Sequence, residues 1–250
     1  VLFETVGMEK LDAELIGKEL LAAAERLAPY CADTVEILHR AMKEGRSLLF
    51  EGAQGTYLDI DQGTYPYVTS SNTTSGGACT GSGVPPQKID RVVGVTKAYT
   101  TRVGEGPFPT QNDDLADRFH KMGREFGATT GRKRRCGWLD LVLVRYAAMV
   151  NGFSALAITI LDGLDDCAEI PVCTHYKLDG KKLFLPPASA KDFQRAVPVY
   201  ENLPGWLTDT TGVTRYQDLP ANALAYLARI ELETETPVTM VGVGPSRDQT

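Results

Sequence analysis

Residues that bind metals or form disulfide bonds are scarce in this sequence. Its 250 residues include only three histidines, His39, His120 and His175, and their expected places in helices or in a hairpin strand favour structural roles. Five cysteines occur, an odd number without a C-x-x-C pair: Cys31, Cys79, Cys136, Cys167 and Cys173. Neither a disulfide framework nor a zinc site is indicated, and a reducing, cytoplasmic location follows most simply.

Long apolar runs and a surplus of basic residues are also missing. No apolar run approaches the roughly 20 residues of a membrane helix, so no contact with a membrane is predicted. A net charge of -6 argues against a nucleic-acid partner, which needs a basic face. The hydrophobic content of 43% and the length suit a globular chain with one large domain or two modest ones. Because Val1 is neither Met nor part of a signal peptide, we expect a fragment of a longer protein.

The spacing of apolar residues predicts both helices and strands. Helices are expected on either side of Pro29 within 8–44, ending near Gly45, and over 88–98, 115–126, 139–150 and 219–233. Apolar strands are expected over 47–52, 155–162 and 237–245. A hairpin that turns at Asp179 and Gly180 is expected within 172–187. This pattern agrees with an α/β protein.

A run rich in Gly, Thr, Ser and Asn, EGAQGTYLDIDQGTYPYVTSSNTTSGG at 51–77, predicts an ordered loop system. The run is interrupted by apolar residues that a surface linker would lack: Leu58, Ile60, Tyr65, Tyr67 and Val68. Glycine lets backbone amides approach a ligand closely, and hydroxyls donate hydrogen bonds without adding charge. A phosphate or a polar heterocycle is therefore one candidate ligand, and a purely structural loop is the alternative.

Three shorter segments are further candidates. ATTGRKRR at 128–135 combines two threonines with four cations, which suits carboxylates or phosphates but is also typical of a solvated face. TILDGLD at 159–165 places Asp162 and Asp165 after a buried strand, where carboxylates bind a base or a metal or simply cap a turn. VGVGPSR at 241–247 follows the last strand, and a glycine pair there is weak evidence by itself.

The order and the amino-acid sequences of these segments resemble those of the adenylosuccinate synthetase family. The resemblance rests on EGAQGTYLDIDQGTYPYVTSSNTTSGG, RVGEGPFPT, EFGATTGRKRRCGWLDLV, TILD, YENLPGW and VGPSR, and it extends from about Phe3 to the last residue. It implies a P-loop-like α/β fold, with a central, mostly parallel sheet flanked by helices and smaller loop and hairpin excursions. We expect 1–250 to form one domain that lacks the N-terminal catalytic part of the family.

The resemblance also implies a reaction and its partners. The family ligates L-aspartate to IMP with GTP, through a 6-phosphoryl-IMP intermediate, and releases adenylosuccinate, GDP and phosphate on the route to AMP. It uses Mg²⁺, and it forms a homodimer in which an arginine of the partner subunit completes the IMP site. A Gly-rich phosphate loop, a catalytic aspartate, a magnesium ligand and a general-acid histidine have no counterpart in 1–50. We therefore expect the catalytic and metal-binding groups upstream of Val1, and no activity from this chain alone.

The family's binding residues transfer to positions that match its motifs. The residues implied for IMP are Gln54, Thr69 and Arg132. Those implied for aspartate are Ala128, Thr129, Thr130, Gly131 and Arg132. Those implied for GTP are Arg134, Ile160, Leu161, Asp162, Gly242, Val243 and Gly244.

One departure from the family pattern leaves the nucleotide preference open. Ile160 stands where the family has lysine, which removes the lysine stem and its charge over the guanine base. Asp162 still matches the residue that accepts hydrogen bonds from guanine and excludes adenine. A synthetase for another purine monophosphate or another triphosphate donor is one alternative. A non-catalytic nucleotide-binding module is the other.

Overall fold

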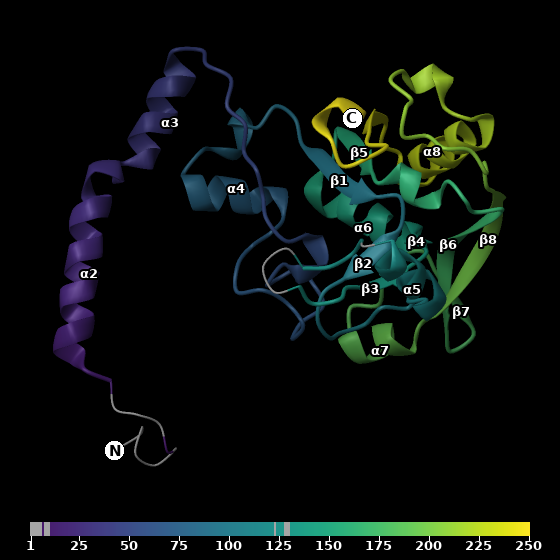
Figure 1. Cartoon of the computed structure of the whole chain (residues 1–250), viewed down its shortest axis with the longest axis horizontal. Coiled ribbons are helices and arrows are strands. Elements are labelled where there is room, and N and C mark those ends of the chain that lie inside the picture. The colour runs from purple at the N-terminus through teal and green to yellow at the C-terminus, as the bar shows by residue number, and fades with distance from the viewer. Residues whose placement is uncertain (1–6, 8–10, 123, 128–130) are drawn as a thin grey trace. The chain divides into compact units, whose positions relative to one another are not determined.

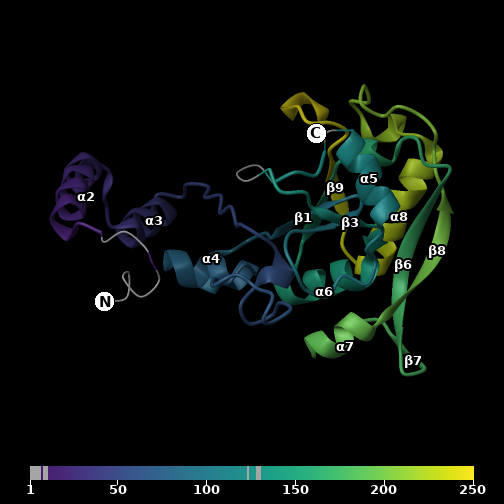
Figure 2. The same ribbon diagram turned by 60° about the horizontal axis from the view of Figure 1, so that its bottom comes forward.

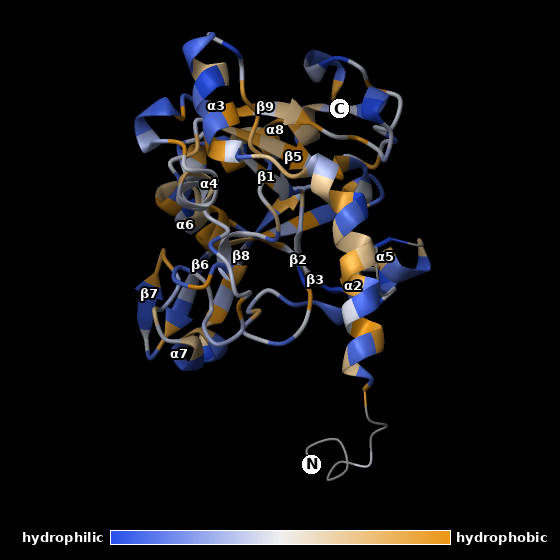
Figure 3. Cartoon of the chain, turned by 90° about the vertical axis from the view of Figure 1, so that its left-hand side faces the viewer, coloured by the Kyte–Doolittle hydropathy of each residue, from blue (hydrophilic) through white to orange (hydrophobic). Residues whose placement is uncertain are grey.

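The computed structural model describes residue 7 and residues 11–122, 124–127 and 131–250. The chain divides into two compact units, Val1–Leu49 and Phe50–Thr250. In the first unit, α2 (Ala13–Leu27), the short 3₁₀ helix η1 (Ala28–Tyr30) and α3 (Thr34–Lys43) follow one another (Figure 1). Apolar and polar residues share the surface of α2 (Figure 3). The two helices predicted around Pro29 are therefore confirmed.

A parallel sheet lies at the centre of the second unit. Its strands β1 (Val93–Lys97), β5 (Ala155–Thr159) and β9 (Val238–Val241) run in the order β1-β5-β9, with both pairings parallel. The central strand β5 is almost wholly buried, which explains why its sequence reads as a continuous apolar run. The predicted α/β class with a mostly parallel sheet and flanking helices is confirmed.

Helices pack around the sheets of this unit. They are α4 (Ser75–Ser82), α5 (Asp113–Lys121), α6 (Leu141–Asn151), α7 (Ala190–Arg195) and α8 (Ala221–Thr234), and Figure 2 shows α6 and α8 beside the parallel strands and α7 near β6 and β7. The predicted helices over 139–150 and 219–233 correspond to α6 and α8. In α8, Tyr226 is fully buried and its hydroxyl donates to the carbonyl of Ala98, directly after β1. This contact fixes the helix against the sheet.

Antiparallel pairings form two further small sheets. Strand β6 (Glu169–Leu178) pairs with β7 (Lys181–Leu183) and β8 (Val197–Pro204), and in parallel with β4 (Leu139–Asp140). The turn between β6 and β7 has positive φ at Asp179 and Gly180, as the hairpin prediction required. Strand β2 (Thr100–Arg102) pairs with β3 (Arg135–Gly137). Short 3₁₀ turns are η2 (Thr56–Leu58), η3 (Pro86–Lys88), η4 (Leu161–Leu164), η5 (Tyr216–Asp218) and η6 (Arg247–Gln249).

Three expectations from the sequence were wrong in whole or in part. Residues 47–52 form no strand: the side chain of Leu49 is 95% exposed, and the segment pairs with no described strand. The predicted helix over 88–98 is instead η3 followed by β1, because the valines of this segment are β-branched and β1 pairs with β5. The helix predicted to reach residue 126 ends at Lys121.

Candidate functional site

The candidate site lies at the carboxyl edge of the parallel sheet. Strands β1, β5 and β9 end at Lys97, Thr159 and Val241, and the paired residues Lys97 and Thr159 bring two of these ends side by side. In α/β sheets, ligands bind beyond this edge because loops and helix N-termini converge there. Two of the segments singled out in the sequence, TILDGLD and VGVGPSR, follow directly from β5 and β9.

Backbone hydrogen bonds join these two segments into one turn system. The amide of Gly242 donates to the carbonyl of Ile158 at 2.7 Å, and the amide of Leu161 donates to the carbonyl of Gly242 at 3.0 Å. A Cβ added at Gly244 would lie 2.3 Å from Oε1 of Gln249, so a larger residue here would displace the side-chain amide of Gln249. The segments predicted for guanine recognition are therefore in contact with each other.

Asp162 is the buried carboxylate of this turn system. Its side chain is 2% exposed, and Oδ2 accepts from Nη2 of Arg124 at 2.6 Å. Both Oδ1 of Asp162 and Nη1 of Arg124 are buried without a hydrogen-bond partner. Unpartnered buried polar atoms are rare and costly, so their occurrence in one ion pair indicates a functional site.

Glu125, the residue after Arg124, binds the cations on the other side. It is 6% exposed and accepts from Nζ of Lys97 at 2.7 and 2.8 Å, from the hydroxyl of Tyr99 at 2.6 Å and from Nη1 of Arg134 at 3.0 Å. Burial alone would raise the pKa of Glu125, but the hydrogen bonds from Lys97, Tyr99 and Arg134 outweigh it and lower that pKa. The carboxylate therefore remains charged and holds Arg134 in place.

Glu125 and Arg134 are the two ends of a hairpin loop. The amide of Arg134 donates to the carbonyl of Glu125 at 2.9 Å, and the amide of Gly127 donates to the carbonyl of Arg132 at 2.8 Å. Gly131 has a φ of 64°, which favours glycine at this bend. The predicted aspartate-binding residues Ala128, Thr129 and Thr130 lie outside the described residues, whereas Gly131 and Arg132 are exposed at the C-terminal side of the loop.

The four clustered cations do not all share one role. Arg135 is bound to the protein through the carbonyls of Gly104 and Gly106 at 3.2 and 3.0 Å and through Oε1 of Gln111 at 2.7 Å. Arg134 is held by Glu125, as described above. Arg132 and Lys133 are exposed. The run is therefore partly structural and not simply a solvated face.

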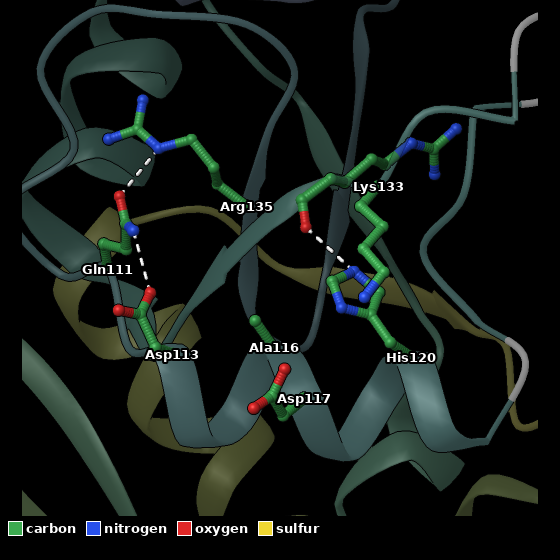
Figure 4. A pocket seen from close by; sticks show the side chains of 8 residues that line it. Gln111, Asp113, Ala116, Asp117, His120, Lys133 and Arg135 are labelled. Atoms are coloured by element: carbon green, nitrogen blue, oxygen red, sulfur yellow. Dashed lines mark hydrogen bonds between the residues drawn. The ribbon is translucent and has the colours of Figure 1, made fainter.

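A pocket of about 230 Å³ lies between α5 and the residues 133–135 that lead into β3 (Figure 4). Asp113, Asp117 and His120 line it from the helix, and Gln111, Ala116, Lys133, Arg134 and Arg135 complete it. Nε2 of His120 lies 3.1 Å from the carbonyl oxygen of Arg134, so the helix also supports the loop from this side. The structural role predicted for His120 agrees with this contact.

The Gly/Thr/Ser/Asn run at 51–77 is organised around one buried carboxylate. Asp59 is fully buried and accepts from the amides of Asp61 and Gln62 at 2.9 Å each, and from those of Thr73 and Thr74 at 2.6 and 3.1 Å. Although burial raises the pKa of this carboxyl, the four amides lower it below its ordinary value. The predicted ordered loop system is confirmed.

Asn151, at the end of α6, attaches this loop system to the core. Its Oδ1 accepts from the amide of Ser75 at 2.7 Å, and its Nδ2 donates to Oγ1 of Thr56 at 3.0 Å. Within the loop system, Gln54 is exposed with a φ of 60°. Thr69 is half-buried, and its amide donates to the carbonyl of Leu58 at 2.8 Å. Gln54 and Thr69 therefore both belong to 51–77, and the backbone of Thr69 is held within this loop system by Leu58.

Several residues of the site escaped prediction from sequence. Arg124 and Glu125 precede the ATTGRKRR motif and were assigned to the interior of a helix that in fact ends earlier. Lys97 was missed because its strand was taken for a helix. The alternation of Val93 and Val95 with smaller residues was the available signal for a strand end at Lys97. Asp59 lay inside the quoted run, and the sequence DIDQG is typical of a carboxylate that binds the following amides.

Other chemistry is limited in the part of the chain that the structure describes. No group of three or more His, Cys, Asp or Glu residues there could hold a metal ion. All five cysteines are free, and Cys136, Cys167 and Cys173 are buried. Among the described helices, none combines the length and apolar character needed to cross a membrane.

Comparison with known sequences identifies the family. The family described as adenylosuccinate synthetase matches residues 2–250. The adenylosuccinate synthetase of Parasynechococcus marenigrum (strain WH8102) is 53% identical over 100% of this chain and 57% of its own length. That of Nitratidesulfovibrio vulgaris (strain DP4) is 52% identical over 98% of this chain and 58% of its own length. The chain thus spans less than two thirds of these relatives.

Solved structures agree with the sequence comparison. The fully ligated adenylosuccinate synthetase of Plasmodium falciparum is 36% identical, with a TM-score of 0.93 over 99% of this chain and 60% of that chain. A succinoaminodeoxyadenylate synthetase of cyanophage S-2L is 20% identical, with a TM-score of 0.52 over 86% of this chain and 49% of that chain, and shares the fold. By sequence and by fold, this chain belongs to the adenylosuccinate synthetase family.

Proposed function

We propose that this chain provides the aspartate and guanine sites, and part of the IMP site, of an enzyme that ligates L-aspartate to IMP at the expense of GTP. The products are adenylosuccinate, GDP and phosphate. The observation that best supports this proposal is the pair of Asp162 and Arg124, which lies directly before the loop between Glu125 and Arg134. A carboxylate that could bind guanine then lies next to cations that could bind phosphates and carboxylates, which supports the proposal.

The chemistry assigns a different task to each part of the site. The 6-oxygen of IMP is a poor leaving group until GTP phosphorylates it, after which the amine of aspartate displaces phosphate. Arg132 and the threonines of the loop bind the carboxylates of aspartate, and Arg134 stabilises negative charge on the GTP side. Because Glu125 holds Arg134, little reorganisation of that guanidinium is needed during the reaction. Gln54 and Thr69 bind IMP from the loop system around Asp59.

Asp162 accepts hydrogen bonds from N1–H and the 2-amino group of guanine. Adenine offers an acceptor at N1 and no 2-amino group, so the base itself would donate no hydrogen bond to this carboxylate. Ile160, Leu161 and the segment Gly242, Val243 and Gly244 surround the base. Ile160 motivates a synthetase with another nucleotide preference, but the relatives named above favour neither that alternative nor a non-catalytic module.

Mg²⁺, a homodimer and a cytoplasmic location complete the proposal. Among the described residues no group of three or more His, Cys, Asp or Glu side chains could hold a metal ion, and no residue of this chain is assigned to Mg²⁺. The free cysteines agree with a reducing compartment. A homodimer would bring an arginine of the partner subunit to the IMP site. Light scattering across a range of concentrations would reveal the oligomeric state.

Binding experiments on this chain test the proposal. Ligand-observed NMR titrations with IMP, GDP and L-aspartate are expected to show saturable binding, whereas steady-state phosphate release with IMP, aspartate, GTP and Mg²⁺ stays at background. Saturation by none of the three ligands would contradict the assignment of their sites to this chain. Turnover would contradict the expectation that essential groups lie elsewhere.

Thr69→Val tests the IMP site in particular. The substitution keeps the shape of the side chain but removes its hydroxyl, so we expect the Kd for IMP to rise about tenfold through loss of a hydrogen bond to the charged phosphate. Thr214→Val is the matched control, since Thr214 is exposed and lies far from 51–77 in the sequence. An unchanged Kd for IMP in Thr69→Val would refute the role of Thr69.

A further inference from the structure

Arg124 is paired with the carboxylate of Asp162. The side chain of Arg124 is 30% exposed and that of Asp162 is 2% exposed, and Nη2 of Arg124 donates to Oδ2 at 2.6 Å. Oδ1 of Asp162 is buried and has no hydrogen-bond partner. A base that donates to both oxygens of this carboxylate therefore competes with Arg124 for Oδ2.

The group that covers Asp162 resembles the ligand proposed for it. A guanidinium presents planar N–H donors to a carboxylate, and the N1–C2–N2 edge of guanine presents N–H donors in the same planar arrangement. In the structure, however, only Nη2 of Arg124 donates to Asp162, and Nη1 is buried without a partner. The ion pair is therefore incompletely hydrogen-bonded, and replacing it by a base that offers two donors would remove this deficit.

We infer that Arg124 is a built-in competitor for guanine at Asp162. The inference rests on the proposed function, in which Asp162 recognises guanine. The arginine satisfies part of the hydrogen-bonding capacity of the carboxylate while the site is empty, and a guanine base displaces it. A base without matching donors leaves the carboxylate paired with Arg124 and the site closed. Arg124 thereby contributes to nucleotide specificity without contacting the base.

The position of Arg124 in the sequence connects its displacement from Asp162 to the loop between Glu125 and Arg134, which is proposed to bind aspartate. Arg124 is followed by Glu125, whose carboxylate holds Lys97, Tyr99 and Arg134. Glu125 has a φ of 59°, an unusual conformation for a residue other than glycine, and its network of bonds holds it there. The side chain of Arg124 thus moves from a fixed backbone anchor, so its release from Asp162 does not require the loop base to unfold.

Arg124→Gln tests the inference, with Arg118→Gln as the matched control. Arg118 donates to the carbonyl of Gly163 at 2.8 Å, next to Asp162 in the sequence. Arg118→Gln therefore removes one positive charge from the same turn but leaves the pair of Arg124 and Asp162 in place. Pairing with Arg124 raises the apparent Kd for GDP, because only the fraction of molecules in which Asp162 is free of Arg124 can bind the base. We therefore expect Arg124→Gln to lower the Kd for GDP about fivefold relative to Arg118→Gln, in NMR titrations of this chain.

Asp162→Asn separates this inference from the proposed function. In that variant the preference for GDP over IDP, which lacks the 2-amino group, is expected to disappear. If Asp162→Asn leaves the preference intact, Asp162 does not recognise guanine, and both the proposed guanine site and the inference fail. If the preference disappears but Arg124→Gln weakens or does not change GDP binding, only the inference fails.

A second readout follows Arg124 directly. In the unsubstituted chain with ¹⁵N-labelled arginine, the Nη signals of Arg124 are expected to show restricted rotation that GDP abolishes and IDP affects less. Restricted rotation that persists at saturating GDP would overturn the inference. Arg124→Lys retains a counter-charge for the buried carboxylate, so it allows the same GDP titration if Arg124→Gln does not fold, with a smaller decrease in Kd expected.

Discussion

Ile160 shows how a single residue can conflict with its position. Its φ of 57° places a β-branched side chain in the left-handed region, where such residues are rare and strained. The same residue packs against the main hydrophobic cluster, which offsets some of the strain. In the resemblance described above, this position belongs to lysine. The residue therefore affects the stability of the turn and, in the proposed function, the contact with the guanine base.

Two substitutions separate these effects of Ile160. Ile160→Leu removes the β-branch but stays apolar, so we expect the melting temperature to rise by a few degrees, for about 1 kcal/mol of released strain, without a change in the Kd for GDP. Ile160→Lys also removes the β-branch, and in the proposed guanine site its ammonium would lie over the base. We therefore expect this variant, unlike Ile160→Leu, to lower the Kd for GDP severalfold. Thermal unfolding and NMR titration measure the two quantities. Equal effects of both variants on GDP binding would refute a role for the lysine charge.

At the scale of an element, helix α6 begins with a buried carboxylate. Asp140 is the N-cap of α6; its Oδ1 accepts from the amide of Leu143, and its Oδ2 accepts from the hydroxyl of Tyr176. Burial raises the pKa of Asp140 to about 7, and these hydrogen bonds only partly oppose the increase. The helix is thus tied to β6 through a group whose charge is disfavoured in the native state.

The raised pKa of Asp140 predicts a pH dependence of stability. A carboxyl with a higher pKa in the folded state contributes its full stabilisation below the unfolded-state value and loses it as the pH rises through the folded-state value of about 7. We therefore expect the free energy of unfolding of Asp140→Asn, relative to the parent chain, to increase by a few kcal/mol between about pH 5 and about pH 8. Urea unfolding at a series of pH values measures this difference.

Ser189→Ala is the control for the effect of pH. Ser189 is the exposed N-cap of α7 in the same unit, and its Oγ accepts from the amide of Asp192 at 3.4 Å. This variant weakens a cap without removing a titratable group, so its difference from the parent chain should stay constant over the same pH range. A constant difference for Asp140→Asn as well would show that its carboxyl does not titrate in this range.

The elements differ in how well the sequence predicts them. Helices α6 and α8 and strand β5 were predicted because long apolar stretches follow the helical period or remain buried on both faces. Strand β1 was misassigned, since its identity depends on pairing with β5, more than 50 residues away in the sequence. The pairing of Arg124 with Asp162 and the four amides on Asp59 could not be predicted either. Such contacts join residues whose proximity exists only in three dimensions.

On the scale of the whole molecule, residues 50–250 contain two hydrophobic clusters that share α6. Leu141 and Val144 belong to the first cluster and Val142 to the second, which also contains Tyr176 and Phe193. Neighbouring residues on one helix thus pack into both clusters. Loss of packing in one cluster therefore affects the other through the position of α6.

This arrangement predicts cooperative unfolding of residues 50–250 produced as a separate chain. We expect one thermal transition with the calorimetric enthalpy equal to the van't Hoff enthalpy. Leu156→Ala, in the central strand β5, should lower the free energy of unfolding by about 2–5 kcal/mol and shift the circular dichroism of backbone and aromatic groups together. Two separate transitions, or a shift of only one signal, would show that the clusters unfold independently.

The wide spacing of β1, β5 and β9 along the sequence has a consequence for how the protein folds. Parallel strands around residues 95, 157 and 240 must meet before Asp162 and the turn at Gly242 come together. Pairings between such distant segments give a high contact order, and closing the intervening loops makes them slow to form. Nucleotide binding is therefore expected to appear late in refolding. The rate at which it appears would report completion of the native topology and not the earlier formation of helices.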